Sequence, residues 1–293
     1  MRNFFWVISF CFLALAACDD GAKTSAPPTE LTVGTWNLQF LADRLDAGEI
    51  PRTATDVAAM VRIIHDGGFG VLAVEEVLSA DSLALLKSHG LGATWRLEVG
   101  ASGGTQKLGV LWDSRVIDRV EDVRELDNAD GLIPADWSGL RYPLHTRVVV
   151  RGGFAFTLVV VHLKAGITNA GATQRARQVE QVAAWTAAHD GPLLIMGDYN
   201  DTFEGILEGV DSLAALETSD AGRFLTADLP EGAFTSLEFM DLIDHVFISP
   251  DLDARVIPDT LSTIDFDLNP ANNGVAISDH RPVRFTIRLT DDP

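Results

Sequence analysis

Short apolar runs bordered by a polar residue recur along this chain, and this pattern constrains its fold more than any other feature. Each run has the length and composition of a buried β-strand. The polar residues that end, follow or directly precede these runs are Asn37, Glu75, Glu76, His162, Asp198, Asn200, Asp279 and His280. An unpaired carboxylate is costly inside a packed core. The pattern therefore predicts a β-sheet protein in which these side chains form one cluster at a sheet edge.

Strand-like segments alternate with segments of helical spacing. We expect helices at 53–65, 79–89 and 173–189, where apolar residues recur every three to four positions. The predicted strands are 31–36, 69–74, 107–112, 146–150, 154–161, 192–196, 244–249, 254–257 and 283–289. Many strands with interspersed helices favour an α/β fold in which two sheets pack together with helices outside.

The first residues are typical of an export signal. Arg2 precedes an uncharged run from residue 4 to residue 17, which is shorter than a comfortable membrane span. The run ends at Cys18 in the tetrapeptide LAAC, which is similar to the lipobox of bacterial lipoproteins. We expect a signal peptide at 1–17, a lipidated Cys18 with a flexible tether at 18–30, and one domain at 31–293. The alternatives are an ordinary signal peptide cleaved nearby and an uncleaved anchor.

Cysteine usage and charge narrow the chemistry. Of the 2 cysteines, Cys11 would leave with the signal peptide and Cys18 would carry lipid, so no thiol remains for a disulfide, a zinc site or a nucleophile. The formal net charge of −20 repels polyanions and argues against a broad nucleic-acid-binding face. A phosphate substrate stays possible, because a bound divalent cation reverses the local field.

The residue types of the cluster favour one kind of reaction. Carboxylates and amides without cysteine favour a hard cation such as Mg²⁺, with Mn²⁺ or Ca²⁺ as alternatives. A histidine held by a carboxylate can take a proton from water. Charge that develops on a phosphoryl oxygen needs positive or hydrogen-bonding partners. This set suits phosphoester hydrolysis.

Six short blocks occur in an order that resembles the endonuclease/exonuclease/phosphatase superfamily. They are TWN at 35–37, LAVEEV at 72–77, VHLK at 161–164, GDYND at 197–201, IDHV at 243–246 and SDHRP at 278–282. That superfamily includes deoxyribonuclease I, abasic-site endonucleases, neutral sphingomyelinases and inositol polyphosphate 5-phosphatases. The resemblance spans residues 31–289 and implies a four-layer α/β sandwich of two mixed sheets flanked by helices.

The resemblance also implies a metal site. Glu76 matches the metal-binding carboxylate of the second block, Asn37 matches the amide beside the metal, and Asp279 is placed to bind metal directly or through water. Glu75 occupies a position usually held by Gln, and we expect it to support the site or to be solvated.

The remaining blocks imply the catalytic residues. Asp198 and Asn200 resemble the pair that positions the water and contacts the phosphate. His280 resembles the histidine that acts as general base or contacts the scissile phosphate, and Asp244 would orient it. Whether Asp198 or His280 takes the proton of the water stays open at this point.

A second histidine and several cations complete the predicted site. His162 matches a histidine of deoxyribonuclease I-like members, where a Glu partners it; we expect Gln106 in that place here, which weakens a role as general acid. Arg141 and Lys164 are candidate phosphate contacts. We expect Arg175 and Arg177 to lie on a solvated helix face.

The predicted function is a divalent-metal-dependent nuclease that acts on DNA or RNA outside the cytoplasm. The chain would be monomeric, anchored through Cys18 in a bacterial cell envelope, on its periplasmic or extracellular face. The first alternative is a phosphodiesterase or phosphatase that acts on lipid headgroups, such as sphingomyelin or phosphoinositide, or on small phosphoesters. The second alternative is an inactive binding lipoprotein.

Overall fold

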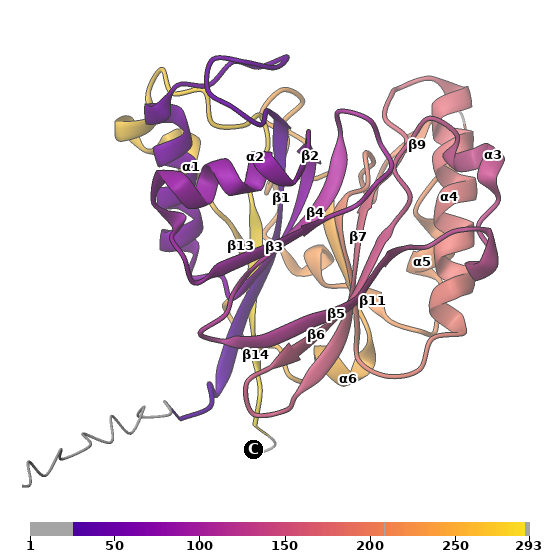
Figure 1. Cartoon of the computed structure of the whole chain (residues 1–293). Helices are drawn as coiled ribbons and strands as arrows, with labels where there is room; N and C mark the ends of the chain where they lie inside the picture. Colours follow the sequence, from indigo (N-terminus) through magenta and orange to yellow (C-terminus); the bar gives the residue numbers. More distant parts are fainter. Residues whose placement is uncertain (1–25, 208, 291–293) are drawn as a thin grey trace, which may run out of the picture.

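The structure is a computed structural model that describes residues 26–207 and 209–290. Two six-stranded mixed sheets face each other, and helices cover their outer faces (Figure 1). The four-layer α/β sandwich predicted from the sequence is therefore confirmed. The described chain starts and ends at the same edge of the sandwich, the lower one in Figure 1. The predicted signal peptide, Cys18 and most of the predicted tether lie outside the described residues.

The first sheet has the strand order β13-β14-β1-β2-β4-β3. Its strands are β1 (Glu30–Leu41), β2 (Val71–Val77), β3 (Trp95–Val99), β4 (Lys107–Asp113), β13 (Ser262–Thr263) and β14 (Val283–Arg288). Strand β1 pairs in parallel with β2 and antiparallel with β14. Every residue of β2 is buried, which its apolar composition VLAVEEV explains except at the two glutamates.

The second sheet has the order β11-β12-β8-β7-β6-β5. Its strands are β5 (Ile117–Glu125), β6 (Leu144–Val150), β7 (Ala155–His162), β8 (Leu193–Asp198), β11 (Arg223–Phe224) and β12 (Asp244–Ile248). Strands β7 and β8 are parallel, and β12 runs antiparallel to β8. A separate small ladder joins β9 (Ile206–Leu207) to β10 (Val210–Asp211).

The longer helices pack on the outer faces. They are α1 (Ala54–Gly67) and α2 (Ala80–Leu86) on the first sheet and α4 (Asn169–Ala187) on the second; α3 (Pro134–Trp137), α5 (Ala214–Glu217) and α6 (Pro250–Asp253) are short. A capping box between Thr53 and Asp56 starts α1, and Gly68 ends it in the left-handed conformation with φ 68°.

Three apolar clusters hold the layers together. One lies between the sheets and includes Val33, Val110 and Met196. A second joins the first sheet to α1 and includes Trp36 and Met60. A third joins the second sheet to α4. Because side chains alternate across a strand, each sheet contributes to the central cluster on one face and to a helix-covered cluster on the other.

The element predictions hold for the long segments and fail at the short or charged ones. The predicted strand at 254–257 is wrong: the chain forms α6 and a turn, and Val256 then makes an isolated bridge to Ile287 of β14. Strands β3 and β5 were not predicted, because their residues alternate with charges and lack an apolar run. No helix in the described part of the chain is both long and apolar enough to cross a membrane.

Candidate active site

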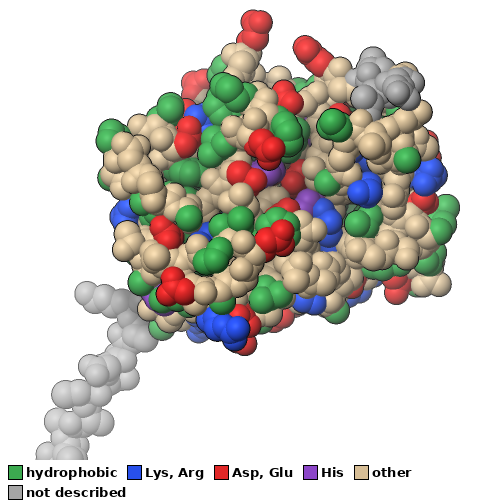
Figure 2. Space-filling model, turned by 90° about the horizontal axis from the view of Figure 1, so that it is seen from above, with side chains coloured by type: hydrophobic (Ala, Val, Ile, Leu, Met, Phe, Trp, Pro, Cys, Tyr) green, Lys and Arg blue, Asp and Glu red, His purple; other side chains and the backbone are tan. Residues whose placement is uncertain are grey.

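The polar cluster predicted from the sequence forms where strand ends of the two sheets meet. His162 ends β7 and lies beside Asp198, which ends the parallel strand β8. Asp244 begins β12 and pairs with Asp198 from the other side. Gly197 allows the close approach, because a Cβ there would lie 1.9 Å from a β7 carbonyl oxygen. Figure 2 looks onto this edge and shows acidic and histidine side chains gathered in a hollow near its middle.

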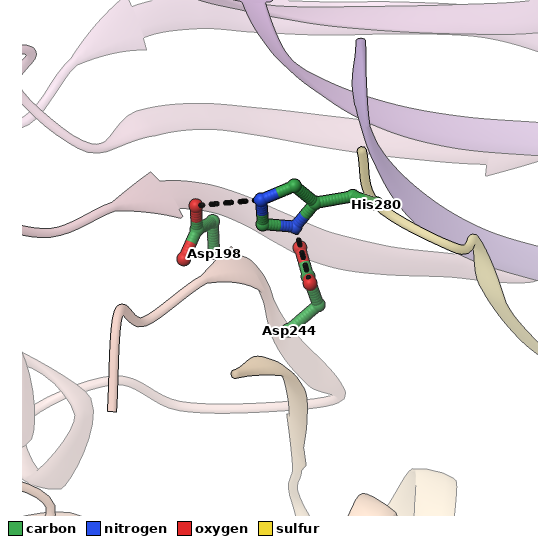
Figure 3. A group of neighbouring side chains, drawn as sticks. All are labelled: Asp198, Asp244 and His280. Atoms are coloured by element: carbon green, nitrogen blue, oxygen red, sulfur yellow. Dashed lines mark hydrogen bonds and ion pairs between the residues drawn. The ribbon is translucent and has the colours of Figure 1, made fainter. Parts of the chain in front are cut away.

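His280 lies between two aspartates from the opposite sheet (Figure 3). Its Nδ1 donates to Asp244 Oδ2 at 2.7 Å, and its Nε2 is 4.0 Å from Asp198 Oδ2. The three side chains could together hold a metal ion. Because Nδ1 is already bonded to Asp244, the arrangement matches an oriented carboxylate–histidine pair better than a set of metal ligands.

The charges around His280 favour its cationic form. Burial alone would lower its pKa, but the charge and hydrogen bond of Asp244, followed by the charges of Asp198 and Asp279, raise the pKa of His280 to about 10. Burial and the charge of Asp244 also raise the pKa of Asp198, against the opposing charge of His280. Asp198 is thereby moved toward the range in which a carboxylate can accept a proton near neutral pH.

A group of oxygen donors lies beside this pair. Asn37 donates through Nδ2 to Asp198 Oδ2 at 3.1 Å, and its Oδ1 accepts from the Gln39 backbone at 2.9 Å. Glu76 is buried in a left-handed conformation with φ 57°, and Asp279 Oδ1 is 4.0 Å from His280 Nε2. Such strained backbone positions are retained where the surrounding structure requires them.

These oxygen donors fit a hard divalent cation. Burial raises the pKa of Glu76, and the charge of Asp279 adds to this, although Asn37, Arg141 and His280 oppose it. Carboxylates that repel one another in a buried site are stabilised by a divalent cation. Asn37, Glu76 and Asp279 would hold it.

His162 differs sharply from His280. It is 2% exposed, its Nε2 lies 3.4 Å from Asp198 Oδ2 and 3.8 Å from Glu76 Oε1, and its Nδ1 has no hydrogen-bond partner among the described residues. Burial, followed by the charges of Arg141 and His280, lowers the pKa of His162 well below its usual range. His162 is therefore neutral and can donate one hydrogen bond through Nε2.

The expected pairing of Gln106 with His162 is wrong. Gln106 Nε2 donates to Glu76 Oε1 at 3.0 Å, and the side-chain Oε1 of Gln106 accepts from Arg141 Nη1 at 3.3 Å. Gln106 therefore connects a candidate phosphate contact to a candidate metal ligand. The sequence placed Gln106 near the cluster, but the choice between two close partners depends on side-chain directions that only the packed structure defines.

The two candidate phosphate contacts lie in different surroundings. Arg141 is 4% exposed, donates to the Leu163 carbonyl at 3.3 Å, and has a buried Nε without a partner among the described residues. Burial lowers its pKa to about 10, although the charges of Asp198 and Glu76 favour the cation. Lys164 is half-buried on the loop after β7, where its ammonium donates to the Ala165 carbonyl. The geometry therefore supports Arg141 more than Lys164.

Asn200 lies beside Asp198 in a conformation that the turn requires. Its φ is 55°, its backbone N–H donates to Asp198 Oδ1 at 2.8 Å, and its Nδ2 donates to the Leu163 carbonyl at 3.2 Å. Asparagine tolerates this left-handed conformation better than most residues. The structure thus places Asn200 with the predicted cluster and holds its amide against the loop after β7.

The model of the Endonuclease/Exonuclease/phosphatase family matches residues 34–280. The chain belongs to this family. That range contains every residue of the cluster described above. No curated protein matches the chain.

Solved structures support the same fold for this family member. A humanized D. rerio TDP2 is 16% identical, with TM-score 0.66 over 89% of this chain and 100% of that one. The D. rerio TDP2 complexed with single strand DNA product is 15% identical, with the same TM-score and coverage. An endonuclease/exonuclease/phosphatase from Bacteroides vulgatus is 15% identical, with TM-score 0.63 over 90% of this chain and 100% of that one. At these identities the likeness concerns the fold alone.

One of the two arginines expected on a solvated helix face is buried in this family member. Arg175 is 3% exposed and not on a solvated face: it pairs with Asp201 at 2.8 Å and donates to the Lys164 carbonyl at 2.9 Å. Arg177 is half-exposed and pairs with Asp136. The helical position of Arg175 is compatible with either environment, because only the loops after β7 and β8 decide what covers it.

The environment of Glu75 distinguishes between the two roles expected for it. Its side chain is fully buried between the sheets, and Thr35 Oγ1 donates to its Oε1 at 2.8 Å. Burial and the charge of Asp244 raise the pKa of Glu75 well above its usual range. Glu75 is therefore a buried supporting residue and is not solvated. Glu76 departs from the strand alternation, with φ 57° in the irregular pairing between Val74 and Val77, so both glutamates lie at the cluster.

Proposed function

We propose that this chain is a divalent-metal-dependent phosphodiesterase that cleaves nucleic acid outside the cytoplasm. The observation that carries the proposal is the position of His280, which Asp244 holds at 2.7 Å beside Asp198, with the oxygens of Asn37 and Asp279 close by. A cation, an oriented carboxylate and hard oxygen ligands at one point are what phosphodiester hydrolysis requires.

The charges favour Asp198 as the acceptor of the proton from the attacking water. Its raised pKa suits a base that works near neutral pH, and Asn37 and Asn200 hold both of its oxygens. His280, held as a cation by Asp244, would contact the phosphate and stabilise the negative charge that develops on it. His162 and Arg141 would donate further hydrogen bonds to the phosphate oxygens.

A bound divalent cation, Mg²⁺ first and Mn²⁺ or Ca²⁺ as alternatives, would polarise a phosphoryl oxygen. Asn37, Glu76 and Asp279 would hold it. Glu76→Gln should raise the Mg²⁺ concentration for half-maximal activity by about 10- to 100-fold, because a neutral amide is a weaker ligand. An unchanged Mg²⁺ titration would remove Glu76 from the ligand set.

Two observations favour nucleic acid as the substrate. They are the histidine block VHLK and the structural similarity to the D. rerio TDP2 complexed with single strand DNA product. The net charge of −20 disfavours a broad electrostatic footprint on a duplex. We therefore propose a narrow contact, in which the cluster holds one phosphate and few Lys or Arg side chains contact the rest of the nucleic-acid backbone. The enzyme would act as a monomer.

A lipid headgroup is the second candidate substrate, and one loop favours it. Residues 234–243 reach the cluster, since Ser236 bridges to His280. The same loop exposes Phe239 (59%) and Met240 (66%). Exposed apolar side chains beside a site can enter a lipid interface.

We also propose that Cys18 is lipidated and tethers the domain to a bacterial envelope membrane, on its periplasmic or extracellular side. Residues 1–17 would be the signal peptide and 31–293 the single domain. Strand β1 begins at the edge opposite the cluster (Figure 1). A tether that enters there would leave the site on the far side of the domain, which favours a soluble substrate over headgroups of the same membrane.

The test uses residues 19–293, which include every element of both sheets. The protein is incubated with supercoiled plasmid, a single-stranded oligonucleotide, sphingomyelin vesicles and phosphoinositide vesicles, each with Mg²⁺ or EDTA. The matched pair of variants is His280→Ala and His65→Ala, since His65 lies exposed on α1. Mg²⁺-dependent nucleic-acid cleavage that only His280→Ala loses supports the proposal. Turnover of lipid alone supports the second candidate, and no turnover of any substrate contradicts both.

A further inference from the structure

Arg52 is a buried cation that has no role in the chemistry described so far. It directly precedes the N-cap of α1 and is 3% exposed. Its guanidinium donates only to backbone carbonyl oxygens: Leu38 at 3.0 Å, Gln39 at 2.8 Å, Ile50 at 3.4 Å, Ala276 at 3.1 Å and Ile277 at 3.0 Å. In the described part of the chain no carboxylate accepts a hydrogen bond from it.

Four of these five carbonyls belong to the two segments that carry Asn37, Asp279 and His280. Leu38 directly follows Asn37, and Ile277 comes just before Asp279 and His280. Other contacts continue the connection: Ser278 Oγ donates to the Asn37 carbonyl at 2.7 Å, and Trp36 Nε1 donates to the His280 carbonyl at 2.8 Å. Arg52 therefore lies at one end of a hydrogen-bonded seam between the end of β1 and the segment before β14.

The end of β1 has a backbone that needs such support. Gln39 and Phe40 are both in the left-handed region, with φ 46° and 54°. Two consecutive residues other than glycine in this region are strained, and the surrounding structure must hold them there. Arg52 supplies two hydrogen bonds at this bend, to the Leu38 and Gln39 carbonyls.

The charge of Arg52 has a second consequence. A buried guanidinium without a hydrogen-bonded carboxylate is unusual, because its desolvation is not offset by a direct ion pair. The charges that favour it lie further off, on Asp279, Asp56 and Glu76. The carbonyl oxygens are therefore the direct hydrogen-bonding partners of this buried cation, which ties the segments that carry them to one another.

We propose that Arg52 is a positioning residue of the active site: it holds the Asn37 segment and the Asp279–His280 segment in register. The inference rests on the proposed function for its kinetic consequence, but its effect on the metal site is measurable without turnover. A planar fork that binds two segments at once is a role that lysine cannot fill.

The test compares Arg52→Lys and Arg52→Met with Arg284→Met in the full-length chain purified in detergent. Arg284 is a matched control, because it also donates to backbone carbonyls, but to those of Asp66 and Gly67 at the end of α1, a helix that carries no residue of the cluster. At saturating Mg²⁺ we expect kcat to fall about 10-fold in Arg52→Lys and about 100-fold in Arg52→Met. The KM of all three variants should stay within about twofold of wild type. The kcat of Arg284→Met should do the same. A folded Arg52→Met with wild-type kcat would overturn the proposal.

A second measurement separates this proposal from the proposed function and does not need Arg52→Met to fold. The rise in Tm that Mg²⁺ causes is measured in wild type, Arg52→Lys and Arg284→Met. We expect Arg52→Lys to lose at least half of the rise and Arg284→Met to keep it. If wild type is inactive on every substrate, this result still supports the positioning role. A full rise in Arg52→Lys, or no rise in wild type, overturns it.

Discussion

The end of β7 and the segment before β14 each place a buried histidine in the cluster, and the two regions give these histidines opposite properties. At the segment before β14, His280 bonds to Asp244 at 2.7 Å and has two more carboxylates near its Nε2. At the end of β7, His162 Nδ1 has no hydrogen-bond partner among the described residues, and burial, followed by the positive charges of Arg141 and His280, lowers the pKa of the ring. Both rings are nearly fully buried, so burial does not distinguish them. Burial lowers both pKa values, and the charge and direct hydrogen bond of Asp244 outweigh it only at His280.

The largest expected effect comes from the carboxylate that both histidines approach. Asp198→Asn keeps the shape and removes the proposed proton acceptor, so we expect kcat to fall by about 10⁴-fold, the upper end for loss of a general base. The measurement is single-turnover cleavage at saturating Mg²⁺. Loss of less than about 10-fold in a folded protein would show that Asp198 is not the base.

His280→Ala should lower kcat by about 10³-fold, because it removes the cation proposed to face the phosphate. Circular dichroism and Tm should show that the variant is folded, and His65→Ala is the matched control. A variant that hydrolyses at more than a tenth of the wild-type rate would contradict the assignment.

Asp244→Asn tests why the two histidines differ. Without the Asp244 charge, the pKa of His280 should fall from about 10 toward or below the usual value. His280 would then be neutral at pH 8 and recharge as the pH falls. We expect about 10²-fold lower kcat at pH 8 and partial recovery at pH 6, seen in a pH–rate profile. A profile parallel to that of wild type would show that Asp244 does not control the charge of His280.

His162→Gln should have a smaller effect, about 10-fold or less on kcat, because glutamine can still donate one hydrogen bond. His162→Phe, which has no donor, should lose more. Neither variant should shift the pH–rate profile, since His162 is already neutral across the working range. If the pH–rate profile of His162→Gln lacked an acidic or basic limb that wild type shows, His162 would have to titrate during turnover.

The smallest effect on activity, but a clear one on stability, is expected from a third histidine. His245 is fully buried, its Nε2 donates to the Asp201 carbonyl at 2.8 Å, and burial lowers its pKa to about 4. Between about pH 6.5 and pH 4 the unfolded chain binds this proton and the folded chain does not, so stability present above pH 6.5 is lost as the pH falls. The free energy of unfolding, measured by urea titration, should fall less steeply from pH 7 to pH 4.5 in His245→Gln than in wild type. An equally steep fall in both proteins would contradict this role of His245.

Much of the site could be predicted because its residues stand in contiguous motifs at strand ends. Glu76 closes an apolar strand, Asp198 ends another, and His280 stands in SDHRP. Parallel neighbours bring such ends together, as β7 and β8 do with His162 and Asp198. The edge strands β3 and β5 escaped prediction for the opposite reason: their pairing comes from neighbours far along the chain and leaves little trace in local composition.

The amino-acid sequence by itself determined the fold class, the family and most members of the cluster, because periodicity and short motifs are local properties. Only the tertiary structure decided the partner of Gln106, the burial of Arg175 and the position of Arg52 beneath the site. It also decided which histidine is charged. Desolvation and Coulomb interactions depend on distances between residues that lie far apart in the chain, and only the packed sheets set those distances.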